Sequence, residues 1–188
     1  MDSALPQQIN NLLRDGVVTE VDHDNALCRV RSGDLQTDFI QWLTPAAGEL
    51  MVWAPPSVGE QVKLLCGDGD VGNAIALRGL YCAQFPSPSN DADVVLVRFK
   101  DGALLRYDSQ AHALTAILPA GGTVAISADG GVTISGPVTI KGNTAITGKV
   151  TITGAVEASD DVVGGGVSLK QHKHSAVQPG GGTSGPPA

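Results

Sequence analysis

Two histidines near the end of the chain have the spacing of metal ligands. His172 and His174 are two residues apart, so in an extended strand both imidazoles point to the same side. One chain then offers two nitrogen ligands, and three chains around a common axis would offer six. Six imidazoles suit an octahedral transition ion such as iron or nickel better than tetrahedral zinc. Without such an axis, the two residues are more simply solvated histidines in a tail.

The segment before these histidines is a six-residue repeat. Five consecutive hexads cover residues 129–158, a degenerate sixth covers residues 159–164, and glycine occupies the second position of the first five. The fourth and sixth positions are mostly apolar and β-branched, so they share one side of a strand, and the glycine allows the chain to turn a corner. Five consecutive matches predict a parallel β-helix or β-solenoid.

Two architectures fit this repeat. A left-handed β-helix of the acyltransferase kind uses about 18 residues per coil, so six hexads would give only two coils of a single chain. That pattern also places glycine directly after the apolar residue, whereas Ile134 and Ile140 are followed by Ser135 and Lys141, with glycine one position later. An intertwined trimer, in which three chains each supply one strand per layer, needs no single-chain core. The sequence favours the trimer.

The two halves of the chain differ in composition. All seven aromatic residues lie at or before Tyr107, which leaves the second half without the large side chains that dominate small cores. Residues 1–122 carry 8 basic and 15 acidic side chains, and residues 123–188 carry 4 of each, which gives the net charge of −7. An acidic chain without a basic stripe is a poor candidate for nucleic-acid binding. No transmembrane helix and no export signal are expected, and the three cysteines should be reduced thiols.

The residue pattern in the first half of the chain predicts a short helix and a small barrel. The spacing of apolar residues predicts an amphipathic helix within residues 1–15. Five short strands, at residues 17–21, 26–31, 39–43, 62–66 and 74–77, predict a small antiparallel barrel or sandwich. An OB-type barrel has about this many strands and this size, so an OB-fold-like domain is expected over residues 16–85. Residues 86–116 are expected to form a linker and two strands, joined at Asp101-Gly102, that lead into a triple-stranded β-helix at 117–165 and an apex at 166–188. The predicted fold is therefore all-β: an OB-fold-like barrel followed by an intertwined triple-stranded β-helix, a homotrimer with a metal-bound apex.

No catalytic motif is convincing. Residues 67–72 match Gly-x-Gly-x-x-Gly, but the next residues read as a strand, so no helix N-terminus would hold a pyrophosphate. The same aspartates lack the glutamate of a calcium loop, because Gly79 stands in its place. No nucleophile elbow and no paired carboxylates stand out. We expect neither an enzyme nor a small-molecule substrate.

The order of these parts resembles the central spike, or baseplate assembly protein V, of contractile phage tails and R-type pyocins. The first anchor is the stretch Trp-Ala-Pro-Pro-Ser-Val-Gly-Glu-Gln-Val at residues 53–62, followed by Gly-Leu-Tyr at residues 79–81. The second is the glycine-punctuated hexad run. The third is His172-Lys173-His174 with its Gly/Pro-rich tail.

This resemblance implies a trimeric spike that caps the tail tube and pierces the outer membrane of the target bacterium. It implies one iron ion per trimer, held by His172 and His174 of three chains, with further axial ions possible. The N-terminal and OB regions would contact hub and baseplate proteins, and the protein would belong to a virion or pyocin particle assembled in the host cytoplasm. The alternatives are a trimeric fibre-type receptor-binding protein and, less favoured, a hexapeptide-repeat acyltransferase.

Overall fold

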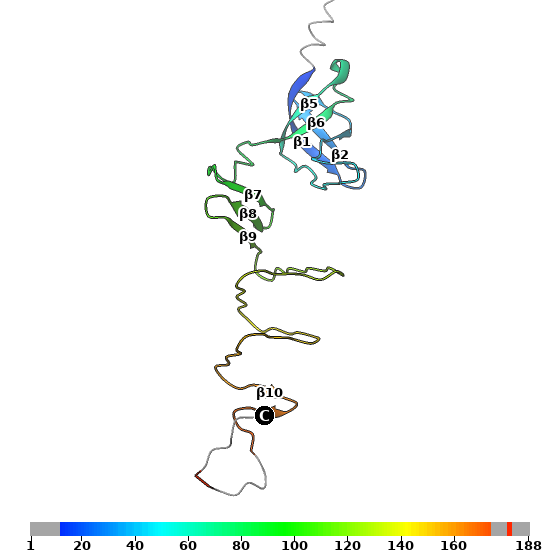
Figure 1. The fold of residues 1–188 in the computed structure, drawn as a ribbon. Helices are drawn as coiled ribbons and strands as arrows, with labels where there is room; N and C mark the ends of the chain where they lie inside the picture. The colour runs from blue at the N-terminus through cyan, green and yellow to red at the C-terminus, as the bar shows by residue number, and fades with distance from the viewer. Residues whose placement is uncertain (1–11, 174–179, 182–188) are drawn as a thin grey trace, which may run out of the picture. The chain divides into compact units, whose positions relative to one another are not determined.

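The computed structural model describes residues 12–173 and 180–181 and contains almost only β-structure. The chain divides between Ile126 and Ser127 into two compact units. Within the described residues the only helical element is a 3-10 turn, η1, at Gly67–Gly69. Figure 1 labels most of the strands. They are β1 (Leu13–Asp22), β2 (Leu27–Ser32), β3 (Leu35–Gln36), β4 (Ile40–Gln41), β5 (Gln61–Leu65), β6 (Ile75–Leu80), β7 (Val94–Arg98), β8 (Leu104–Asp108), β9 (Ala113–Ile117), β10 (Val163–Gly164) and β11 (Val167–Ser168).

The first six strands form the barrel that the sequence predicts. Their order is β3-β2-β1-β5-β6, with β4 paired to β2, and all these pairings are antiparallel. A bridge between Trp42 and Ala76, with a 2.9 Å hydrogen bond from Leu43 N to Ala76 O, joins the end of β4 to β6. This contact closes the sheet on itself, as an OB barrel requires.

The barrel core comes from alternate residues of its strands. Val18, Val30, Val62 and Leu64 are fully buried, as expected for strands that present every second side chain to one face. Cys28 and Cys66 are buried free thiols in the same core. The core is therefore complete within one chain.

The N-terminal boundary of the barrel differs from the sequence-based prediction. Leu13, Arg14 and Asp15 belong to β1 and pair with Leu65, Leu64 and Lys63 of β5, so they are not helical. The predicted helix was wrong for these three residues, because pairing with β5 satisfies their backbone. The remainder of that helix, residues 1–11, lies outside the described residues.

The Gly-x-Gly-x-x-Gly segment is a loop between strands. It forms η1 and a turn in which the Asp70 carboxylate accepts a 2.9 Å hydrogen bond from Gly72 N. The chain then enters β6, as the sequence predicts, so no helix N-terminus follows.

A separate three-stranded antiparallel sheet follows, in the order β7-β8-β9. The Asp101-Gly102 turn joins β7 to β8 as predicted, with Gly102 at φ 90°. Sequence analysis did not anticipate β9. The Asp108 carboxylate positions it by accepting hydrogen bonds from the backbone N–H groups of Gln110 and Ala111 at 3.1 and 2.9 Å.

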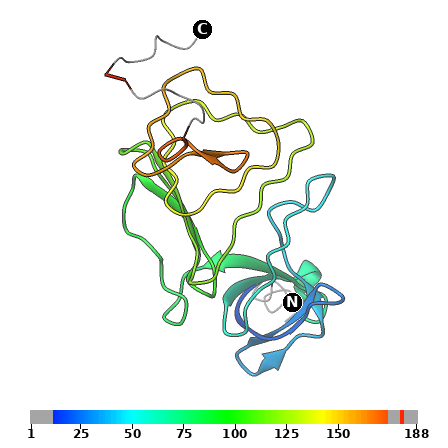
Figure 2. The same cartoon turned by 90° about the horizontal axis from the view of Figure 1, so that it is seen from below.

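The hexad segment buries nothing within one chain. Every residue from 116 to 160 is exposed, and no strand is assigned between residues 118 and 162. The apolar hexad positions are more than half exposed in all seven of their main members: Val132, Ile134, Val138, Ile140, Ile146, Val150 and Ile152. Figure 2 shows the segment as an open trace in yellow and orange.

The hexad glycines explain how the repeat turns. Gly136, Gly142 and Gly148 have φ values of 127°, 130° and 132°, so three successive repeats share one backbone conformation. A Cβ at Gly142 or Gly148 would meet nothing within 4 Å in the single chain. In one chain, glycine is therefore favoured at these positions because L residues rarely adopt this φ.

Candidate metal-binding apex

A small hairpin precedes the predicted metal ligands. Strands β10 and β11 pair antiparallel, with Val163 opposite Ser168 and Gly164 opposite Val167. Gly165 and Gly166 connect them with φ values of 57° and 84°. A two-residue hairpin loop of type I′ needs positive φ at both positions, which glycine adopts without strain. Sequence analysis did not anticipate this hairpin; it assigned the residues of β10 to the degenerate sixth hexad, which ends at Gly164.

The turn after β11 fixes the imidazole of His172. Ser168 O accepts hydrogen bonds from His172 N at 3.0 Å and from His172 Nδ1 at 3.0 Å, and Leu169 O lies 3.2 Å from Nδ1. A carbonyl only accepts hydrogen bonds, so in the neutral ring the proton is on Nδ1. The lone pair is then on Nε2, and a carbonyl acting on the far nitrogen is the usual arrangement behind a histidine metal ligand.

Neighbouring side chains hold this turn in place. Gln171 N donates to Ser168 Oγ at 2.8 Å, and Lys170 N donates to Asp161 Oδ1 at 3.1 Å. Hydrogen bonding from the Ser168 hydroxyl, and then from Lys170 N, holds the pKa of the Asp161 carboxyl below its ordinary value of 3.8. The carboxylate is therefore ionised at neutral pH. Asp161 and Ser168 hold the turn that positions the ring. They were not found from the sequence, because they do not form a recognisable metal-ligand motif.

One chain does not assemble a metal site among the described residues. His174 lies outside them, so its position beside His172 stays a prediction. Within residues 12–173 and 180–181, no three His, Cys, Asp or Glu side chains gather closely enough to hold an ion.

The Trp-x-Pro stretch of the barrel is held by an ion pair that sequence reasoning did not find. The Arg78 guanidinium donates to both carboxylate oxygens of Glu60, from Nε at 2.8 Å and from Nη2 at 2.9 Å. It also donates to the carbonyls of Ala54 and Pro55, and Ser57 N donates to Glu60 Oε2 at 3.0 Å. Arg78 thus ties the loop at residues 54–60 to strand β6.

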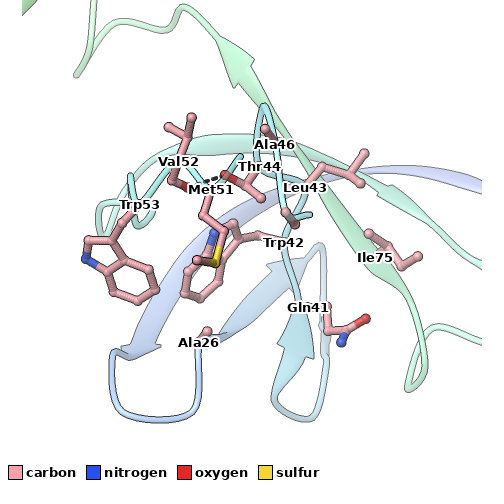
Figure 3. A pocket seen from close by; sticks show the side chains of 11 residues that line it. Ala26, Gln41, Trp42, Leu43, Thr44, Ala46, Met51, Val52, Trp53 and Ile75 are labelled. Carbon is pink, nitrogen blue, oxygen red and sulfur yellow. Dashed lines mark hydrogen bonds between the residues drawn. The ribbon is translucent and has the colours of Figure 1, made fainter. Parts of the chain in front are cut away.

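An apolar hollow lies on the barrel beside this loop. The ring centroids of Trp42 and Trp53 are 5.9 Å apart, and the two ring planes make an angle of 56°. Met51 lines the same hollow (Figure 3). The hollow has a volume of about 650 Å³, and Trp53 and Met51 remain 62% and 77% exposed. Exposed apolar surface of this kind is typical of sites that contact another protein.

Comparison with known proteins agrees with this arrangement of an OB barrel and a histidine-bearing tail. Residues 14–81 match the type VI secretion system/phage-baseplate injector OB domain, and residues 166–188 match the GpV apex motif. The spike protein of Escherichia phage P2 is 40% identical over 129 residues, which cover 69% of this chain and 60% of that protein. Together, these matches support membership of the chain in the baseplate spike protein V family. The apex motif of this family is a metal-binding apex.

None of the described residues forms a helix of the length and hydrophobicity needed to cross a membrane.

Proposed function

We propose that this protein is the homotrimeric central spike of a contractile tail baseplate, in a phage or an R-type pyocin. The observation that carries the proposal is the similarity to the P2 spike protein, together with the OB and apex matches in the same order along the chain. The spike would cap the tail tube and hub and would pierce the outer membrane of the target bacterium. It would be a component of the particle, assembled in the host cytoplasm.

The exposed hexads support the trimer. A segment with uniformly exposed Val and Ile at alternate positions has no reason to be ordered as a single chain, because nothing offsets the entropy lost on ordering. In an intertwined trimer, the strands of three chains would bury these residues at the threefold axis. Each hexad would advance by roughly 5 Å, the spacing between strands, so six hexads would make a rod of roughly 30 Å. Each strand would have neighbours on both sides and no free edge.

The residues at the apex fit a transition metal. With Nδ1 donating to the Ser168 carbonyl, the His172 ring would present Nε2 as the ligand atom, and three copies with His174 would supply six nitrogens. We propose one iron ion per trimer at this position, because six imidazoles satisfy an octahedral ion. The metal would supply no chemistry on a substrate. It would hold three chain ends together at the narrow tip.

The mechanism is mechanical. Sheath contraction would load the wide OB end, and a rod without free edges would transmit that load to the tip. The hollow around Trp42 and Trp53 supports contact between the OB domain and hub proteins. The membership in a structural spike family supports the absence of enzymatic activity.

The test is the mass and metal content of the purified full chain. Sedimentation equilibrium should give three times the chain mass of 19.2 kDa, and elemental analysis should give about one iron per three chains. Immuno-electron microscopy should place the protein at the baseplate tip of assembled particles. A monomer in solution, or a location on tail fibres, would overturn the proposal.

A further inference from the structure

The carboxylate of Asp161 holds the turn that leads to the predicted metal ligands. It accepts hydrogen bonds from the Ser168 hydroxyl and from Lys170 N, the second at 3.1 Å. Asp161 and Ser168 are also the only residues from 116 to 173 that are partly buried, and all others in that range are exposed. Hydrogen bonds that are partly shielded from water are stronger than exposed ones. This contact therefore gives local order to a part of the chain that otherwise buries nothing by itself.

The hairpin of β10 and β11 brings this carboxylate to the turn. Leu169 N donates to Val162 O at 3.0 Å, which continues the pairing of the two strands by one step. At the following step a side chain takes the place of a backbone acceptor, because Asp161 Oδ1 receives the hydrogen bond from Lys170 N. The carboxylate thus ends the ladder and begins the turn at residues 168–172.

The same turn orients the imidazole of His172. Ser168 O accepts hydrogen bonds from the backbone N and from Nδ1 of His172, each at 3.0 Å. Ser168 therefore contacts the Asp161 carboxylate through its hydroxyl and the imidazole through its carbonyl. All of these bonds lie within one chain, so the direction of the ring does not depend on other copies.

We propose that Asp161 is a positioning residue for the apex metal: by fixing the turn within each chain it aims Nε2 of His172 before an ion binds, and so sets how tightly the ion is held. The inference rests on the proposed iron site of the trimer. A ligand that is already oriented loses less conformational freedom on binding, which raises affinity. Groups that support a histidine ligand from behind typically contribute about 10- to 100-fold to metal affinity.

The neighbouring carboxylate of Asp160 provides a matched control. Its side chain is 89% exposed, and it contacts the Lys170 ammonium at 3.2 Å. Among residues 12–173 and 180–181, no cation forms an ion pair with Asp161. A general effect of negative charge near the apex would arise from both carboxylates, whereas the bonds to the turn arise from Asp161 alone.

The experiment measures how firmly the full-length trimer retains ferrous iron. Iron-loaded protein is dialysed without oxygen against rising concentrations of a coloured ferrous chelator, and the concentration that removes half of the iron is recorded. For Asp161→Ala this concentration should be at least about tenfold lower than for wild type, whereas Asp160→Ala should match wild type. Asp161→Asn keeps an acceptor oxygen for Lys170 N without the charge, so it should recover most of the loss.

Sedimentation of each variant separates the possible outcomes. An Asp161→Ala trimer that retains iron as firmly as Asp160→Ala would overturn the inference. An Asp161→Asn trimer that releases iron as readily as Asp161→Ala would also overturn it, because the carboxylate would then act through its charge. A wild-type trimer without iron, or a wild-type monomer, would overturn the proposed function instead.

The tautomer of His172 gives a second measurement that needs neither metal nor trimer. Nitrogen-15 chemical shifts, assigned with His172→Ala, report which ring nitrogen carries the proton at alkaline pH, where imidazoles are neutral. Metal-free wild type should hold the proton on Nδ1, as the bond to Ser168 O requires. Asp161→Ala should show a mixture of both tautomers, and Asp160→Ala should show the wild-type signal. An unchanged signal in Asp161→Ala would overturn the inference.

Discussion

Removing the guanidinium of Arg78 should destabilise the OB barrel far more than removing an exposed cation. The side chains of Arg78 and Glu60 are only 20% and 14% exposed. Arg78→Met removes four hydrogen bonds and leaves the Glu60 carboxylate mostly buried beside Ser57 N. Breaking a fully buried pair costs about 3–5 kcal/mol, and an exposed pair contributes about 0–1 kcal/mol. For this partly exposed pair we expect a loss of about 2–3 kcal/mol.

Tryptophan fluorescence measures this loss selectively, because both tryptophans, Trp42 and Trp53, belong to the barrel. For a domain of this size, a loss of about 2–3 kcal/mol should lower the Tm by roughly 8–24 °C. The matched control is Lys63→Met on β5, whose ion pair with Asp15 has side chains 44% and 66% exposed. Its Tm should fall by only a few degrees.

A double variant separates the missing pair from a stranded charge. Arg78→Met together with Glu60→Leu removes both partners, so no carboxylate remains buried without its cation. The double variant should therefore be more stable than Arg78→Met alone. The reasoning is refuted if Arg78→Met costs no more than the Lys63→Met control, or if the double variant is at least as unstable as the single one.

Three further perturbations follow from the structure. Gly148→Val should lower the melting temperature of the proposed trimer, because a φ of 132° costs an L residue about 1–3 kcal/mol per copy. Thermal melts followed by circular dichroism should show no such change for the control variant Thr147→Ser. An unchanged melting temperature for Gly148→Val would contradict the argument. Burial raises the pKa of the Cys28 thiol from 9.0 to about 11, so the fold favours the neutral thiol. The resulting stability is complete below pH 9 and is lost as the pH rises towards 11, and urea titrations should show a shallower loss in Cys28→Val. His172→Ala with His174→Ala should remove the bound iron measured by elemental analysis and leave the sedimenting trimer intact; retained metal would disprove the ligand assignment.

The strands of the barrel could be predicted from sequence, because alternating apolar residues indicate a strand with one face buried within the same chain. Val18, Val62 and Leu64 stand at alternate positions of short runs bounded by turn residues, and the structure buries them. Strand β9 was missed because Ala113–Ile117 lacks that alternation. Its place is fixed by its register with β8 and by the Asp108 turn, which are properties of the sheet.

The ion pair between Arg78 and Glu60 could not be predicted from the sequence for a related reason. The two residues are 18 positions apart, and they meet only because β5 and β6 pair with an irregularity between Gln61 and Lys63. A one-residue change of register would move a side chain to the other face of the sheet. Contacts of this kind depend on pairing geometry, which apolar periodicity alone does not specify.

The chain combines two ways of gaining order. The barrel buries its core within one chain, so its stability does not depend on neighbours. Residues 116–160 bury nothing alone, and ordering each of them costs roughly 1–2 kcal/mol of backbone entropy. In the proposed trimer, contacts between copies would offset that cost, so folding and association of this segment would be one process.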